Sequence, residues 1–369
     1  MRKIDFLHSP QFWQQGFGPT HPLRQERLQR TYELLDELGA FDPENVQVIT
    51  PPPPGEEELA LFHTKEYINA VRSLSMGETH IPSARYGFGP GDNPIFPGMF
   101  ESSGLKVGST LWGAKLLANR ECEVAFSYSG GLHHAGPDFA SGFCIFNDAA
   151  VAIHWLINQG LRIAYVDIDV HHGDGVQNAF YSTDEVLTIS LHQSGRTLFP
   201  GTGFIDEIGV DEGEGYSVNV PLPPYTDDDI YLWAFHQIVP PLVERFEPDI
   251  LVTQLGVDTH YLDPLARLAL TTRGHKLLFE ELSCLASRWL ALGGGGYDID
   301  VVPRSWTLAF GIMSGQSFPE ELPPDYQAKY GGKWLEDHRA PQIDENVKWL
   351  TRRSVEEVVS HVRELHGLA

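Results

Sequence analysis

The stretch Arg162–Gly175 (RIAYVDIDVHHGDG) decides the fold. Its first six residues form a short apolar run with β-branched side chains, and aspartates, histidines and glycines follow at once. An apolar run of this length without alternation is typical of a strand in a parallel sheet that is covered on both faces. Because ligands of open parallel sheets bind beyond the carboxyl ends of the strands, the polar residues indicate a ligand site.

Four further apolar runs share this form, and each is followed by a polar or glycine-rich segment. They are Glu123–Tyr128 before SGGLHHAG, Val186–Leu191 before HQSG, Asp249–Gln254 before LGVDTH, and Trp289–Leu292 before GGGGYD. Helical patterns lie between them, including 148–159 and 228–246, and another is expected near the C-terminus at 354–366. This alternation predicts an α/β fold with one central, mainly parallel sheet and helices on both faces.

The length of 369 residues allows two domains or one large α/β unit. Hydrophobic residues make up 42% of the chain, enough to bury a sizeable core, so wholesale disorder is excluded. The net charge of -24 opposes binding to the phosphates of nucleic acids. It would attract a cationic substrate, although solubility is the plainer interpretation of such a surface.

Three cysteines, Cys122, Cys144 and Cys284, form no CxxC pair, which predicts a reducing compartment and no disulfide framework. The first residues, MRKIDFLHSPQFWQQ, contain no apolar region of the kind that a secretory signal has. No stretch of about 18 apolar residues could span a bilayer. We therefore expect a soluble, cytoplasmic protein that does not associate with a membrane.

The strongest chemical signal is a set of two carboxylates and one imidazole. Asp169 and His171 are two residues apart just past a strand, where alternate side chains point the same way, and Asp258 follows another strand. This donor set fits a catalytic Zn²⁺ or Fe²⁺ with coordination positions left open. Each aspartate alone could instead cap a helix or form an ion pair, but their distribution over several strand ends favours a metal.

The adjacent histidines His133 and His134 indicate proton transfer, because imidazole titrates near neutral pH. Each needs a carboxylate to fix its tautomer, and Asp167 and Asp174 remain after metal ligation. The run Gly293–Gly296 would let the backbone approach a site closely and would place the hydroxyl of Tyr297 there as an oxyanion donor. A phosphate loop is disfavoured because no GK[ST] follows the glycines.

An ordered series of motifs resembles the zinc-dependent histone deacetylase family, particularly its bacterial acetoin-utilisation-type members. The motifs are HPLRQER (21–27), GGLHHA (130–135), SGFCIFND (141–148), YVDIDVHHGDGVQ (165–177), FPGTG (199–203), LGVDTHYLDPL (255–265) and GGGGY (293–297). The resemblance implies the single-domain deacetylase/arginase-like fold. It also implies hydrolysis of an acetylated amine, with acetyl-lysine in a protein or peptide as the leading substrate.

A change in composition after Ser317 predicts a catalytic domain at 1–318 and a C-terminal extension at 319–369 that packs on the same domain. The resemblance assigns a role to each residue of the two sets above. The metal ligands are Asp169, His171 and Asp258; the general base and later acid is His134, supported by Asp174; the companion imidazole is His133, supported by Asp167; and the donor to the acetyl oxygen is Tyr297.

Further positions match the substrate tunnel of the family and its potassium sites. The tunnel positions are Gly142, Phe143 and Phe199 along the walls, Leu265 at the mouth, Asp92 on the rim and Arg27 at an internal pocket for acetate. One potassium site would use Asp167, Asp169, His171, Ser190 and Leu191, and a second Phe180, Thr183, Val186 and Tyr216. Only the resemblance implies these ions.

Three departures from the family pattern leave the substrate open. Leu132 stands where many eukaryotic relatives carry a larger residue, His260-Tyr261 follows the third ligand, and the proline-rich loop 88–97 reshapes the rim. An acetylpolyamine or other small-amide hydrolase, a binuclear manganese ureohydrolase and a non-catalytic acyl-ligand binding protein remain as alternatives. The sequence predicts no particular oligomeric state.

Overall fold

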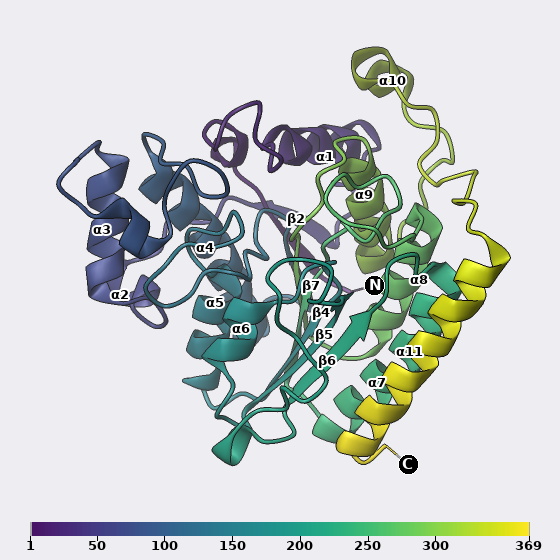
Figure 1. The fold of residues 1–369 in the computed structure, drawn as a ribbon. Helices are drawn as coiled ribbons and strands as arrows, with labels where there is room; N and C mark the ends of the chain where they lie inside the picture. Colours follow the sequence, from purple (N-terminus) through teal and green to yellow (C-terminus); the bar gives the residue numbers. More distant parts are fainter. Residues whose placement is uncertain (1, 369) are drawn as a thin grey trace.

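The computed structural model describes residues 2–368, which form an eight-stranded parallel sheet between two layers of helices (Figure 1). The strand order is β2-β1-β3-β8-β7-β4-β5-β6, and every neighbouring pair is parallel. The strands are β1 Ile4–Leu7, β2 Val46–Ile49, β3 Val124–Ser127, β4 Ile163–Asp167, β5 Val186–Gln193, β6 Ser217–Leu222, β7 Ile250–Gln254 and β8 Trp289–Leu292. This architecture confirms the α/β fold expected from the sequence.

The five predicted strands are β3, β8, β7, β4 and β5, which stand side by side in the middle of the sheet. The prediction missed the strands at the two edges. β1 contains the charged residue Asp5, the edge strand β2 is only partly buried, and β6 is interrupted by Asn219 and Pro221. None of these three segments has the continuous apolar run by which the central strands were recognised.

Helices cover both faces of the sheet. They are α1 Glu26–Glu37, α2 Glu56–Leu59, α3 Lys65–Ser75, α4 Met99–Ala118, α5 Asp148–Ile157, α6 Asp174–Ala179, α7 Asp228–Phe246, α8 Thr272–Cys284, α9 Val301–Ser314, α10 Pro324–Tyr330 and α11 Glu345–Leu365. Apolar side chains of α4, α5 and α6 pack on one face, and those of α1, α7, α8, α9 and α11 pack on the other (Figure 1).

Two helix predictions need correction. The helix expected at 148–159 ends earlier, at Ile157, while its start is fixed by Asn147, whose side chain accepts the backbone N–H of Ala150 at 2.9 Å. The helix expected at 354–366 begins earlier, at Glu345, because the Asp344 carboxylate caps the N–H groups of Asn346 and Val347. The helix at 228–246 was predicted correctly.

The four central strands β3, β8, β7 and β4 carry the chemical motifs at their carboxyl ends. In this spatial order they lead to His133-His134, Tyr297, Asp258 and Asp169-x-His171. Parallel strands bring their carboxyl ends to one edge of the sheet, so segments far apart in the chain meet there. No helix within residues 2–368 combines the length and the apolar character needed to cross a membrane.

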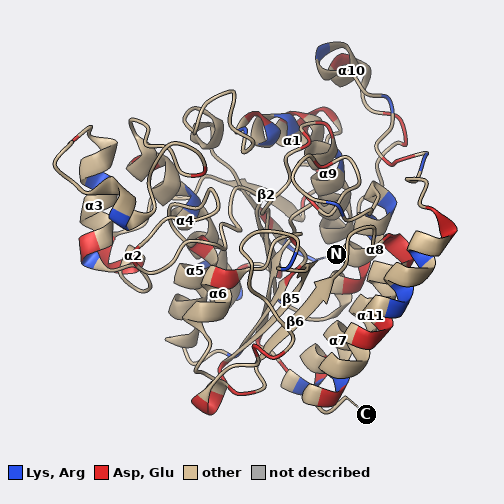
Figure 2. Cartoon of the chain, viewed as in Figure 1, with Lys and Arg blue, Asp and Glu red and all other residues tan. Residues whose placement is uncertain are grey.

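Residues 319–368 lie along the outside of the molecule, with α10 at the end of the α1 and α9 layer and α11 beside α7 (Figure 1). Apolar residues of α10 and its flanking loops pack against Leu34 of α1 and Leu308 of α9. The inner face of α11 buries Val355, Val359 and Val362. Acidic and basic side chains lie on its outer surface (Figure 2), where Trp349 and Leu350 are also exposed.

We predict that Val359→Ala lowers the free energy of unfolding by about 2 kcal/mol, because it removes buried methyl groups and leaves a cavity. Equilibrium unfolding in urea would measure the change. Glu357→Ala, on the exposed face of the same helix, is the matched control and should change stability by less than about 0.5 kcal/mol. Equal stability of Val359→Ala and the wild type would show that α11 is not part of the cooperative core.

Candidate metal centre and active site

Asp169, His171 and Asp258 converge at the carboxyl ends of the neighbouring strands β4 and β7. The Nδ1 atom of His171 lies 3.0 Å from Asp169 Oδ1 and 3.1 Å from Asp258 Oδ2. One ligand atom from each residue lies within 4.8 Å of the others, and all three side chains are buried. The structure therefore brings together the three residues that the sequence indicated as a metal site.

Neutral donors hold the remaining carboxylate oxygens. Asp169 Oδ2 accepts the Nε2–H of Gln254 at 2.5 Å and the backbone N–H of Gly295 at 2.8 Å, and Asp258 Oδ1 accepts the N–H of Val170 at 2.8 Å. Each aspartate is thus anchored by one oxygen and turns the other toward His171. A Cβ at Gly295 would overlap both carboxylates, so only glycine fits there. Two oxygens and one nitrogen, oriented by outer partners, fit a divalent metal such as zinc.

The charges in this cluster also favour a cation. Burial and the neighbouring Asp169 raise the pKa of Asp258 to about 6. Burial opposes protonation of His171, but hydrogen bonds and charge interactions with Asp169 and Asp258 outweigh it and raise the pKa of His171 to about 10. The two buried carboxylates therefore need a positive partner, which is either the imidazolium or a metal ion.

Each of the tandem histidines has a carboxylate partner. His133 Nδ1 lies 2.8 Å from Asp167 Oδ2, His134 Nδ1 lies 2.7 Å from Asp174 Oδ1, and the two Nε2 atoms are 3.1 Å apart. Asp167 also accepts the hydroxyl of Tyr165 at 2.7 Å. With each Nδ1 held by a carboxylate, the two Nε2 atoms face each other and remain the nitrogens at which a general acid–base pair would exchange protons.

The two imidazoles differ in proton affinity. Burial opposes protonation of His133, but Asp167 and Asp169 raise its pKa to about 9. Burial and the neighbouring His133 lower the pKa of His134 to about 4, and Asp174 offsets only part of this effect. At neutral pH one ring is therefore charged and the other is neutral and able to accept a proton.

Aromatic side chains surround the centre. Phe199, 43% exposed, packs edge-on against His134 with ring centroids 5.0 Å apart. Phe143 packs edge-on against Tyr297 at 5.6 Å, and the ring of Tyr297 lies 6.2 Å from that of His171. Phe199 thus reaches from the protein surface to His134, and half-buried Phe143 packs on Tyr297, so apolar rings lie beside the buried polar groups.

Gly142 and Arg27 lie against the same centre. A Cβ at Gly142, whose φ is +51°, would overlap the ring of His134. Arg27 is buried, and its Nη1 donates to the carbonyls of Gly294 at 2.7 Å and Gly296 at 3.1 Å. Arg27 therefore supports the glycine run that leads to Tyr297.

Leu265 and Asp92 are placed by other side chains of the site. Leu265 is half-buried, and its N–H donates to Asp263 Oδ1 at 2.9 Å. Asp92 is exposed, and its carbonyl lies 3.2 Å from Nε2 of His21, which packs edge-on against Phe143.

The residues that the resemblance assigns to potassium fall into two places. Asp167 and Ser190 are register partners on β4 and β5, and the carbonyl of Leu191 accepts the hydroxyl of Tyr231 at 3.0 Å. The second group lies at the amino-terminal ends of β5 and β6 and just after α6. It comprises Phe180, Thr183, Val186 and Tyr216. The first group therefore lies beside the metal ligands, and the second lies at the amino-terminal ends of the strands.

Sequence reasoning missed several residues that orient the site. Gln254 anchors Asp169, and Asp263 Oδ2 accepts the backbone N–H of Tyr297 at 2.8 Å. His21 occurs in a recognised motif but was given no role. Gln254 ends a predicted strand at the ligand-binding edge, and Asp263 lies in LGVDTHYLDPL, so their positions could have drawn attention to them.

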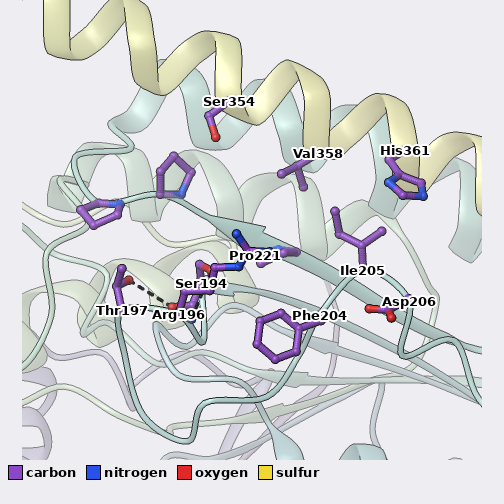
Figure 3. Close-up of a pocket in the computed structure, with 12 residues that line it drawn as sticks. Ser194, Arg196, Thr197, Phe204, Ile205, Asp206, Pro221, Ser354, Val358 and His361 are labelled. Atoms are coloured by element: carbon purple, nitrogen blue, oxygen red, sulfur yellow. Dashed lines mark hydrogen bonds between the residues drawn. The ribbon is translucent and has the colours of Figure 1, made fainter.

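A separate cavity of about 870 Å³ lies between α11 and the segment 194–206 (Figure 3). Val358 and His361 of α11 face Phe204 and Ile205 across it. None of the metal-site residues or tandem histidines lines this cavity. This cavity is therefore separate from the cluster of metal-site residues and histidines at the carboxyl ends of the central strands.

Comparison with known proteins identifies this arrangement. The family model described as the histone deacetylase domain matches residues 21–313. The chain belongs to the histone deacetylase family. This membership confirms the resemblance seen in the sequence and makes the protein a hydrolytic deacetylase of a zinc-dependent family.

Individual relatives support the same family membership. The chain is 42% identical to the acetoin utilization protein AcuC of Bacillus subtilis over 89% of this chain and 87% of that one. It is 35% identical to type-1 histone deacetylase 1 of Dictyostelium discoideum over 94% of this chain and 70% of the relative.

Solved structures agree as well. A crystal structure of a histone deacetylase homologue complexed with SAHA matches with a TM-score of 0.89 at 31% identity, over 98% of this chain and 99% of that one. A histone deacetylase homologue from Aquifex aeolicus matches with a TM-score of 0.86 at 32% identity, over 97% of this chain and 100% of that one.

We predict that zinc binding at pH 7 releases at least one proton per site. The pKa of His171 is raised to about 10, so the free protein holds a proton that the metal must displace. Zinc affinity should consequently rise about tenfold per pH unit between pH 7 and 9. Calorimetric titration in buffers of different ionisation enthalpy would count the protons. Binding without proton release at pH 7 would contradict the protonated state of His171.

Proposed function

We propose that this deacetylase hydrolyses acetyl-lysine in proteins or peptides to acetate and free lysine. One observation supports this most: three metal-ligating side chains, two histidine–carboxylate pairs and Tyr297 meet at one end of the sheet behind aromatic walls. The proposal assigns zinc to Asp169, His171 and Asp258, although the donor set would also accept Fe²⁺. A zinc ion held by these three residues would supply Lewis-acid chemistry, lowering the pKa of a bound water to about 7 and polarising the acetyl carbonyl.

His134 is the proposed general base. Its neutral ring accepts a proton at Nε2 from the water that attacks the acetyl carbon, while Asp174 holds Nδ1. The same nitrogen then gives the proton to the departing amine, so that acetate and lysine leave. His133, paired with Asp167, keeps its positive charge beside the reacting centre and stabilises the negative charge that develops there.

Tyr297 is the proposed oxyanion donor. Burial raises the pKa of Tyr297 well above its usual value, and the neighbouring Asp258 and Asp169 raise it further, so the hydroxyl stays protonated and can donate. A donor aimed at the charge of a tetrahedral intermediate contributes roughly 3–4 kcal/mol to catalysis.

The aromatic walls are proposed to select the acylated form of lysine. Phe143 and Phe199 suit the neutral aliphatic stem, whereas a charged ammonium group would lose its hydration between them. Gly142 leaves room beside His134, and Leu265 borders the mouth. Asp92 would bind backbone amides of the substrate at the rim. Arg27 would attract the acetate product into the interior.

Potassium at both groups of residues described above belongs to the proposal. Asp167 and Ser190 supply oxygens on neighbouring strands at one register, and hard oxygen donors suit such a cation. We also propose that residues 1–318 are the catalytic domain, that 319–369 is an extension of it, and that the protein works in the cytoplasm.

The test of substrate class is a panel of acetyl-lysine peptides, acetylspermidine, acetylputrescine and longer acyl-lysines with zinc-loaded protein. We predict the highest kcat/KM for acetyl-lysine peptides. His134→Ala is the control for the site and should lose about 10²–10⁴-fold in kcat. Preference for acetylpolyamines, which the net charge of -24 would attract, would reassign the substrate. Zinc retention without turnover of any amide would indicate an acyl-ligand binding protein.

We predict that Tyr297→Phe lowers kcat by about 10²–10³-fold and leaves zinc content unchanged, because only the oxyanion donor is removed. Steady-state kinetics on an acetyl-lysine peptide, with metal analysis of the same samples, would measure both. Tyr261→Phe, in the loop after Asp258, is a matched control that removes another hydroxyl close by. Full activity of Tyr297→Phe would rule out the assigned role.

A further inference from the structure

Asp337, in the segment between α10 and α11, links three elements of the catalytic domain to the C-terminal extension. Its side chain is only 9% exposed. Oδ2 accepts the Nε2–H of His260 at 2.7 Å and the backbone N–H of Thr272 at 3.0 Å, and Oδ1 accepts Nη1–H of Arg304 at 2.9 Å. The backbone N–H of Asp337 donates in turn to Thr272 Oγ1 at 2.7 Å. A single carboxylate therefore joins the loop after β7 to the starts of α8 and α9.

The hydrogen bonds of His260 fix its tautomer. Its ring is fully buried, and its Nδ1 accepts the backbone N–H of Leu262 at 3.2 Å. Because Nδ1 is an acceptor, the ring proton is on Nε2 and points to Asp337. The imidazole is thus held between its own loop and the extension, with both nitrogens satisfied.

The loop that carries His260 also carries groups of the active site. Metal-ligating Asp258 is two residues before it, and the backbone N–H of His260 donates to the carbonyl of Val257 at 3.2 Å. On the other side, the N–H of Asp263 donates to the His260 carbonyl at 2.9 Å. Asp263 then accepts the backbone N–H of Tyr297 at 2.8 Å. The position of His260 therefore affects both the metal ligand Asp258 and the proposed oxyanion donor Tyr297.

We propose that Asp337 is a positioning residue for the metal centre, acting through His260 on the loop of Asp258 and Asp263. The segment 314–369 lies beyond the match to the family model, which ends at residue 313. His260 is also one of the positions where the sequence departs from the family pattern. The buried His260 lies in the loop of the metal ligand Asp258, and the carboxylate that accepts its hydrogen bond comes from the C-terminal extension. The two residues thus form one unit from two parts of the chain.

The same reasoning gives the extension a function besides packing. Outer partners that orient metal ligands commonly change metal affinity or activity 10–100-fold when they are removed. Without Asp337, the buried Nε2–H of His260 would lose its acceptor, and the loop would have to shift to reach another one. The activity part of this inference rests on the proposed function, whereas its effect on metal binding does not.

The test compares Asp337→Ala with Glu336→Gln, a change in the adjacent residue that removes the same negative charge. Glu336 pairs with Lys276 at 2.7 Å on the partly exposed surface and makes no contact with His260. Competition with a chromophoric chelator would measure the zinc dissociation constant. We expect Asp337→Ala to raise it about tenfold and to lower kcat about tenfold, with KM changed less than twofold. Glu336→Gln should match the wild type in all three.

His260→Ala provides the second arm, and it decides the question if Asp337→Ala fails to fold. It should reproduce the loss of zinc affinity, and the double variant should lose no more than either single one, because both remove the same link. Thermal unfolding of the zinc-free proteins separates stability from positioning. Lowered stability with unchanged zinc affinity and kcat would overturn the proposal. If the wild type deacetylates nothing, the proposed function fails, while the zinc constants still test the role of Asp337.

Discussion

Two buried carboxylates directed at one point are the constraint on which the site depends. Asp169 and Asp258 are removed from water, and their like charges would oppose folding unless a positive partner lay between them. The surrounding residues serve this arrangement: Gln254, Gly295 and Val170 each donate to a carboxylate oxygen that does not face His171. The parallel sheet supplies the geometry, since β4 and β7 are neighbours although their sequences are far apart.

The part of the fold that could be predicted follows from burial. The five central strands are apolar throughout because both faces are covered, and the motifs after them are visible because metal ligation and proton transfer need few residue types. The outer strands β1, β2 and β6 carry polar residues or a proline and lack this signature. The contacts of Gln254, Asp263 and Asp337 were not predictable, because each pairs residues brought together only by the tertiary fold.

Family membership and geometry answer different questions about this protein. Membership establishes hydrolytic deacetylation, and the same metal-ligating and acid–base groups would serve any acetylated amine. We therefore propose that discrimination between substrates comes from groups farther out, such as Phe199 and the loop that contains Asp92. His21 links that loop to Phe143, because its Nε2 lies 3.2 Å from the carbonyl of Asp92 and its ring packs edge-on against Phe143.

The division of labour between the tandem histidines follows from the carboxylates around each ring. His133 lies 2.8 Å from Asp167 and 3.9 Å from Asp169, both almost completely buried, so two poorly screened negative charges hold its proton. The carboxylate partner of His134 is Asp174, whose side chain is 19% exposed, and His134 stands beside the charged ring of His133. Only a neutral imidazole can take a proton from water, which is why we propose His134 as the base and His133 as the fixed charge. The adjacent residues are chemically identical, and the assignment of their roles depends entirely on position.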